Sequence, residues 1–371
     1  MHEEHKNIQD LISYLNKCFS EISPDEAISQ MQLAAELPDI HISLIAMLIN
    51  GINRLKNNEL LHKSVVDTSF SSRNTSYLEL PTGLISYDEA AILGRSGYIF
   101  LIGGSNDVIG QYYPIDQSYV DLSEKWISLI KERIKNSISR NIKYFQIIIP
   151  EKITIIPEYF PYSISTPTRL LDKLEFEISK FEQDKFYISG RKLMCSQFRR
   201  EHLCKRTDSH LSPEGTYLLF RNMLKTIYDL TIEDVLFTKK NRSIGDLSFR
   251  MSGYFVTEEY SEVSTKDLPM FANDSLKILD DQPENNGHMG KRQIWNNPNA
   301  PIKSRVVVFG NSFFSLVENG QSTLSWWFSK WVTEFHFVWT NEVDWQYVDE
   351  ISADTVIWQG IERFLPIVPG S

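Results

Sequence analysis

Short apolar runs that alternate with amphipathic stretches fill the chain from residue 77 onward. The first run, residues 97–102, predicts a strand that ends in a glycine turn. An amphipathic helix is predicted over residues 121–137, and the apolar run 143–149 predicts a buried strand that Pro150 ends. Strands and helices that alternate at this spacing are typical of a parallel sheet with helical crossovers.

The same alternation returns near the C-terminus. It predicts a buried strand, a helix and two further strands, over residues 305–309, 324–328, 335–339 and 355–358. A stretch rich in Asp, Asn, Pro and Lys, from about 258 to 303, separates the two halves and predicts a polar excursion with little core of its own. We therefore expect an α/β fold with one sheet across residues 77–366, interrupted by this excursion.

Apolar residues at helical spacing dominate the first sixty positions instead. Residues 8–19 show this spacing, and Ser23 followed by Pro24 has the composition of a helix start. We expect a helical module over residues 1–64 and a main domain over 65–371. The module is either a docking element for a partner protein or a helical lid on the main domain.

Composition narrows the function classes. The 371-residue chain carries 38 basic and 48 acidic residues, a net charge of −10 that argues against nucleic-acid binding and against adhesion to anionic membranes. Its three cysteines, Cys18, Cys195 and Cys204, have neither a disulfide framework nor paired metal-ligand spacing, so we expect no metal site. No apolar run approaches the ~20 residues of a membrane span, and the N-terminus lacks the features of a secretory leader. These features favour a cytoplasmic protein.

Two segments carry candidate chemistry. Gly310, Asn311 and Ser312 follow the predicted strand over 305–309, at the strand end where parallel sheets place nucleophiles and ligands. A serine needs a base, and His210 lies two residues after Asp208, a carboxylate that can orient the imidazole. Alternatively, the first segment is only a turn and Asp208 caps the helix that Ser212 and Pro213 predict.

The order of these segments resembles a known family, the SGNH-hydrolase-like O-acetyltransferases of the alginate-acetylation type. In that family an Asp-x-His-(Trp)-x-Pro-x-Gly segment precedes a Gly-Asp-Ser-Phe segment, as residues 208–215 precede 310–313 here. Further segments resemble family blocks in the same order: 97–101, 149–152, 157–161, 245–247, 354–357 and 362–365. The resemblance implies an SGNH-like three-layer α/β fold with reordered motifs, in which Ser312 is the nucleophile, His210 the base and Asp208 its orienting acid.

Two positions depart from the family pattern. Asn311 stands where the family usually has aspartate, and Leu211 where it often has tryptophan. Both leave the three expected catalytic side chains in place. Gly104 and Asn106 also resemble the Gly-x-Asn-Asp block of SGNH hydrolases, which implies an oxyanion role for Asn106. Alternatively, residues 104–106 form a simple turn, and the segment near Gly360 is the spatial equivalent of the Gly-x-Asn-Asp block.

The resemblance implies transfer of an acetyl group, through an acyl-serine, to a hydroxyl of a carbohydrate such as a surface polysaccharide. For a chain without a leader we expect acetyl-CoA to be the donor, with no bound cofactor, and the helical module to dock a glycan-assembly protein. The alternatives are a carbohydrate or acyl esterase with the same triad and a catalytically silent glycan-binding protein.

Overall fold

The computed structural model describes residues 82–86, 88–104, 106–113, 118–181, 186–251, 257–269, 272, 277–282, 289–315 and 320–370. The helical module expected over residues 1–64 lies outside these ranges. None of the helices in the described ranges is long and apolar enough to cross a membrane.

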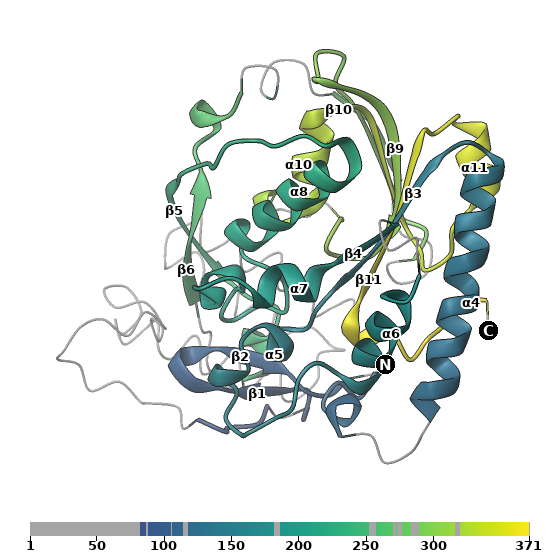
Figure 1. Cartoon of the computed structure of the whole chain (residues 1–371). Helices are drawn as coiled ribbons and strands as arrows, with labels where there is room; N and C mark the ends of the chain where they lie inside the picture. Colours follow the sequence, from purple (N-terminus) through teal and green to yellow (C-terminus); the bar gives the residue numbers. More distant parts are fainter. Residues whose placement is uncertain are drawn as a thin grey trace, which may run out of the picture.

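A seven-stranded sheet forms the centre of the molecule (Figure 1). Its strands, in spatial order, are β4 (Tyr187–Ser189), β3 (Lys143–Ile149), β11 (Thr355–Ile361), β9 (Ile302–Gly310), β10 (Val332–Trp339), β8 (Arg292–Asn296) and β7 (Lys277–Gln282). The five strands from β4 to β10 run parallel, and β8 and β7 continue the sheet antiparallel. The expected α/β fold is therefore confirmed.

Strand β11 lies at the heart of the parallel part. Ile357 pairs with Val308 on β9 and with Phe145 on β3, and all seven residues of β11 are buried. Nearly continuous apolar sequence is what a parallel strand needs when helices cover both faces of its sheet. This is why apolar runs in the sequence predicted the strands β3, β9 and β11 correctly.

Helices cover both faces of the sheet (Figure 1). Ile147 and Val308 belong to the core cluster that also contains residues of α8 and α10, and Ile148 and Val307 belong to the one with residues of α4 and α6. The sheet and the two helical layers that cover its faces make up the expected three-layer arrangement. The helices are α4 (Ser118–Ser139), α5 (Lys152–Ile155), α6 (Arg169–Ile178), α7 (Gly190–Cys195), α8 (Pro213–Tyr228), α10 (Leu324–Trp331) and α11 (Trp345–Glu350).

Short 3₁₀ helices complete the connections. They are η1 (Arg95–Gly97), η2 (Gly110–Tyr112), η3 (Pro157–Tyr159), η5 (Arg200–Leu203), η6 (Ser248–Arg250), η7 (Thr265–Asp267), η8 (Gly320–Ser322) and η9 (Glu362–Phe364).

The strand expected over residues 97–102 does not join the central sheet. It is the short β2 (Ile99–Leu101), which pairs antiparallel with β1 (Ala91–Leu93) in a sheet of its own. The expected crossover from this strand through α4 to β3 is therefore wrong. An apolar run of this length indicates a buried strand but not its partner, and here Ala91 and Ile99 pack with Leu247 and Met251.

The polar excursion expected from about 258 to 303 contains more structure than its composition indicates. Strand β6 (Thr257–Val263) pairs with β5 (Phe237–Ile244), and β7 and β8 extend the central sheet. Gln293 and Trp295 on β8 are buried between half-buried neighbours. Antiparallel strands near a sheet edge bury one face only, so their sequences are as polar as those of loops. The expectation of little core is wrong for this part.

Candidate active site

Asp208 and His210 form a compact hydrogen-bonded turn. The Asp208 Oδ1 atom accepts hydrogen bonds from the backbone N–H of His210, at 2.9 Å, and from its ring Nδ1, at 2.7 Å. A carboxylate acceptor at Nδ1 assigns the ring proton to that nitrogen and leaves Nε2 as the basic position. Burial by itself would raise the pKa of Asp208, but the positive charges of Lys205 and His210 outweigh it and hold this pKa far below its usual range.

The helix that follows keeps this turn in register. Helix α8 begins at Pro213, and the Ser212 hydroxyl accepts a hydrogen bond from the backbone N–H of Gly215 at 3.1 Å. The predicted cap and first-turn proline are confirmed. Ser212 is therefore the cap, which leaves the Asp208 carboxylate to the imidazole rather than to the helix.

A buried lysine binds backbone carbonyls of the segment that leads to His210. Lys152 follows β3, and its ammonium group donates to the backbone carbonyls of Ile99 at 2.8 Å and Asp208 at 2.5 Å. A third, longer bond of 3.3 Å reaches the carbonyl of Arg206. Burial lowers the pKa of Lys152, while neighbouring acids including Glu258 raise it. One buried cation thus ties the segment before His210 to β2.

Glu258 binds backbone N–H groups of the same segment. Its carboxylate accepts hydrogen bonds from the backbone N–H of Arg206 at 2.5 Å and from the Thr207 hydroxyl at 3.0 Å. Burial raises the pKa of Glu258, and the positive charge of Lys205 lowers it. The carboxylate lies on β6, inside the stretch that was expected to be a polar excursion.

Residues 245–247 pack directly against the turn. The backbone N–H of Leu247 donates to the carbonyl of Thr207 at 3.1 Å, and a Cβ atom on Gly245 would lie 2.1 Å from that same carbonyl oxygen. Only glycine allows this approach. Asp246, between them, accepts hydrogen bonds from the backbone N–H and the hydroxyl of Ser209 at 2.6 and 2.5 Å.

Asn311 organises the turn after β9. Its carbonyl accepts hydrogen bonds from the backbone N–H groups of Phe314 and Ser315, and its side-chain Oδ1 accepts from that of Phe313 at 3.3 Å. Asn311 therefore caps one helical turn that begins at Ser312, a role for which asparagine and aspartate are equally suited. The side-chain Oε1 of Gln359, on β11, accepts the backbone N–H of Asn311 at 3.0 Å.

The two predicted segments meet at Phe313. Its ring packs against the His210 ring with centroids 5.0 Å apart, so the imidazole lies against the residue next to Ser312. Ser312 is half-buried, and no hydrogen bond joins its hydroxyl to His210. Catalytic hydrogen bonds are often long or misaligned without substrate. The structure brings Asp208 and His210 together and sets them beside the Ser312 turn.

Gln111 connects the loop with Gly104 and Asn106 to η9, the 3₁₀ helix that follows β11. The Gln111 amide donates to the backbone carbonyl of Asn106 at 2.7 Å and to that of Arg363, just after β11, at 3.0 Å. Gly104 has a φ of +85°, as its glycine turn requires. Within the described ranges, no hydrogen bond connects the Asn106 side chain to the Ser312 turn. Its oxyanion role stays a prediction.

Sequence reasoning did not assign roles to Lys152, Asp246 or Glu258. The first two lie in segments that resemble family blocks, 149–152 and 245–247, and this was the signal that could have singled them out. Glu258 had no such signal, because a lone glutamate in a polar stretch is usually solvated.

Asp208, His210 and Asp246 also have the spacing of a metal site, with possible ligand atoms within 4.8 Å of one another. Each of these groups already has hydrogen-bond partners. Nδ1 of His210 donates to Asp208, and both oxygens of Asp246 accept from Ser209. The set therefore has the chemistry of an imidazole held by carboxylates, and we assign no ion to it.

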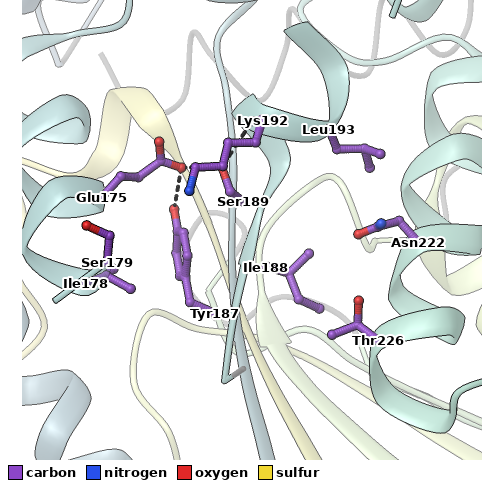
Figure 2. A pocket seen from close by; sticks show the side chains of 10 residues that line it. All are labelled: Glu175, Ile178, Ser179, Tyr187, Ile188, Ser189, Lys192, Leu193, Asn222 and Thr226. Carbon is purple, nitrogen blue, oxygen red and sulfur yellow. Dashed lines mark hydrogen bonds between the residues drawn. The ribbon is translucent and has the colours of Figure 1, made fainter. Parts of the chain in front are cut away.

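A cavity of about 400 Å³ opens elsewhere, along the edge strand β4 (Figure 2). The Glu175 carboxylate faces it with the hydroxyls of Tyr187 and Ser189 as donors, and α8 contributes Asn222 and Thr226. None of the predicted site residues lines it. It is therefore distinct from the Asp208–His210 turn.

No protein-family model and no curated protein matches the chain. Similar solved structures include Bacillus cereus PatB1, with a TM-score of 0.48, 12% identity, and coverage of 67% of this chain and 92% of that one. The O-acetyltransferase domain of Pseudomonas putida AlgJ has a TM-score of 0.45, 14% identity, and coverage of 75% and 92%. Pseudomonas aeruginosa AlgX has a TM-score of 0.41, 10% identity, and coverage of 73% and 61%.

Proposed function

We propose that this chain is an O-acetyltransferase that moves an acetyl group, through an acyl-serine on Ser312, to a carbohydrate hydroxyl. The observation that carries the proposal is the 2.7 Å hydrogen bond between Asp208 and His210, packed through Phe313 beside the serine turn. The sequence segments that resemble the SGNH-like O-acetyltransferases supply the reaction class.

In the proposed first step, Nε2 of His210 takes the hydroxyl proton of Ser312 while Oγ attacks the carbonyl carbon of the acetyl donor. The donor's leaving group then departs with the proton that the imidazolium returns. In the second step, Nε2 takes the proton of the sugar hydroxyl, whose oxygen attacks the acyl-serine. The bond between the acyl carbon and Oγ of Ser312 then breaks, the imidazolium returns its proton to Oγ, and the acetylated product leaves. A base of this kind contributes roughly 10²–10⁴-fold to the rate.

The negative charge on the carbonyl oxygen needs donors in both steps. The carbonyl of Asn311 is the first acceptor of the helical turn. The backbone N–H of Ser312 therefore lies at the start of that turn, where N–H groups have no partner within the turn. We assign the oxyanion to this N–H group, with the Asn106 amide as a second donor. One such donor is worth about 3–4 kcal/mol of transition-state stabilisation.

We propose acetyl-CoA as the donor and a polysaccharide or its precursor as the acceptor, in the cytoplasm. Residues 1–64 would then dock a glycan-assembly protein. Deleting residues 1–63 should remove such a partner from pull-downs of the full-length chain, and an unchanged set of partners would refute the docking role.

The decisive experiment incubates the protein with acetyl-CoA and an oligosaccharide and identifies the products by mass spectrometry. Acetylated oligosaccharide that is lost in Ser312→Ala supports the transferase. Free acetate without acetylated sugar identifies an esterase. Absent turnover, with equal glycan affinity in wild type and Ser312→Ala, identifies a silent binding protein.

A further inference from the structure

A second carboxylate faces the imidazole of the acid–base pair. Besides the Asp208 oxygen at 2.7 Å, the Nδ1 atom of His210 has Oδ2 of Asp246 at 3.8 Å. The Ser209 hydroxyl lies beside both atoms, 3.5 Å from Nδ1, and donates to that same Asp246 oxygen at 2.5 Å. The Asp246 side chain is about a quarter exposed, so its charge is only partly screened.

The placement of Asp246 follows from the glycine before it. Gly245 packs its backbone onto Thr207, with its N–H donating to the Thr207 hydroxyl at 3.1 Å. This contact fixes where the next side chain emerges, at the backbone of Ser209. The close packing of Gly245 on Thr207 therefore places the Asp246 carboxylate at Ser209, the residue between Asp208 and His210.

The other charged groups around the imidazole act at longer range. Lys205 lies 3.9 Å from the Asp208 carboxylate, Lys152 binds the Asp208 carbonyl, and Glu258 binds Arg206 and Thr207. None of these makes a direct contact with the ring in the described ranges. Asp208 and Asp246 are thus the two charges that face Nδ1.

We propose that Asp246 is a positioning residue that acts through His210: it fixes the Ser209–His210 backbone and favours the protonated imidazole. This inference rests on the proposed function, because the imidazolium forms when His210 takes the proton of Ser312. Burial and the Asp208 charge raise the pKa of Asp246, whereas the pKa of Asp208 is lowered. The two carboxyl groups therefore differ in pKa, with Asp208 the stronger acid.

The first test needs no activity. The imidazole signals of His210, identified with a His210→Gln protein, are followed by NMR against pH in the full chain. Asp246→Asn, which keeps the shape and removes the charge, should lower the midpoint of this titration by about one pH unit. Asp229→Asn is the matched control, because Asp229 caps the C-terminus of α8, roughly 25 Å along the helix from Ser212, in a left-handed conformation that asparagine tolerates.

An unchanged His210 midpoint in Asp246→Asn would overturn the proposal, whether or not the protein acetylates anything. Should Asp246→Asn fail to fold, Asp246→Ser applies the same test with a smaller polar side chain. Ser209→Ala keeps the charge and removes the hydroxyl, so it should leave the midpoint close to that of wild type.

The second test uses the transferase reaction. Asp246→Asn should lower kcat about tenfold with little change in KM for the sugar, since the lost interaction favours only the charged imidazole. A rise in KM at constant kcat would contradict a role in proton transfer. Absent activity in wild type would refute the proposed function and leave the NMR result to decide on Asp246.

Discussion

The ammonium group of Lys152 and the backbone carbonyl of Asp208 are joined by a 2.5 Å hydrogen bond within the protein interior. Lys152 lies just beyond the carboxyl end of β3, and Asp208 lies just before the predicted base. This contact links the Asp208–His210 turn to the central sheet. The acid–base pair is thus tied to the segment that follows a strand of the central sheet.

Replacing Lys152 with methionine should therefore reduce both stability and activity. Buried carbonyls left without a donor cost about 1–3 kcal/mol, and the neighbouring carboxylates lose one of the two buried lysines beside them, Lys205 being the other. Urea unfolding and the transferase assay measure the two effects. Lys135→Met, on the exposed side of α4, is the control and should change neither. A fully active Lys152→Met protein would show that the turn does not need this anchor.

Gly245→Ala should disturb the turn by sterics alone. The new methyl group would meet the Thr207 carbonyl at 2.1 Å, so the 245–247 segment must move away from residues 207–209. We expect a loss of stability of about 1–3 kcal/mol and a large loss of activity. Gly104→Ala has nothing within 4 Å of its Cβ and tests the effect of backbone conformation without a clash. Equal activity of Gly245→Ala and wild type would argue against a tight fit here.

Asn311→Asp restores the residue that the resembled family usually has. The Oδ1 acceptor for the Phe313 N–H is retained, so the cap survives and a negative charge is added at the start of the turn. Acetyl transfer should change less than about tenfold, whereas Asn311→Ala should destabilise the protein by about 1 kcal/mol. A far larger loss of activity in Asn311→Asp would mean that the asparagine amide itself contacts the reacting groups.

Glu362 gives the fold an unusual pH dependence. Burial raises its pKa to about 7. The hydrogen bonds that its carboxylate accepts from the backbone N–H groups of Thr168 and Glu151 lower the pKa, but burial outweighs them. Between the ordinary glutamate value of 4.5 and pH 7 the unfolded chain releases this proton while the folded chain keeps it. The contribution of Glu362 to stability is therefore largest below that window and falls as pH rises through it.

Urea unfolding at a series of pH values, with Glu362→Gln as the non-titrating reference, measures this contribution. The unfolding free energy of wild type minus that of the variant should fall by on the order of 3 kcal/mol from pH 4.5 to 7. A difference that stays constant, or that rises with pH, would contradict a raised pKa at this position.

The sequence predicted the parallel part of the fold because β3, β9 and β11 are covered on both faces and must be apolar throughout. It failed for β7 and β8, because in β8 polar residues flank the pair of Ile294 and the buried Trp295 on both sides. It also failed for β2, whose partner strand no local pattern specifies. Helix α8 was predictable because Ser212 and Pro213 are local signals.

The candidate site divides in the same way. Asp208 and His210 are two residues apart, so one turn can join them and the pattern indicates it. Lys152, Asp246 and Glu258 reach that turn from segments 37 to 56 positions away in the sequence. Their contacts depend on how the sheet and the β5–β6 ribbon fold back, which residue spacing does not reveal.

The central claim is that Ser312 carries the acetyl group and that His210 activates it. Intact-mass analysis after brief exposure to acetyl-CoA or a chromogenic acetyl ester tests this most directly. Wild type should gain the mass of one acetyl group at Ser312, and Ser312→Ala and His210→Ala should each lose about 10³-fold or more in rate, with little further loss in the double variant. Acetylation that persists in Ser312→Ala, or an unchanged rate in His210→Ala, would contradict the account.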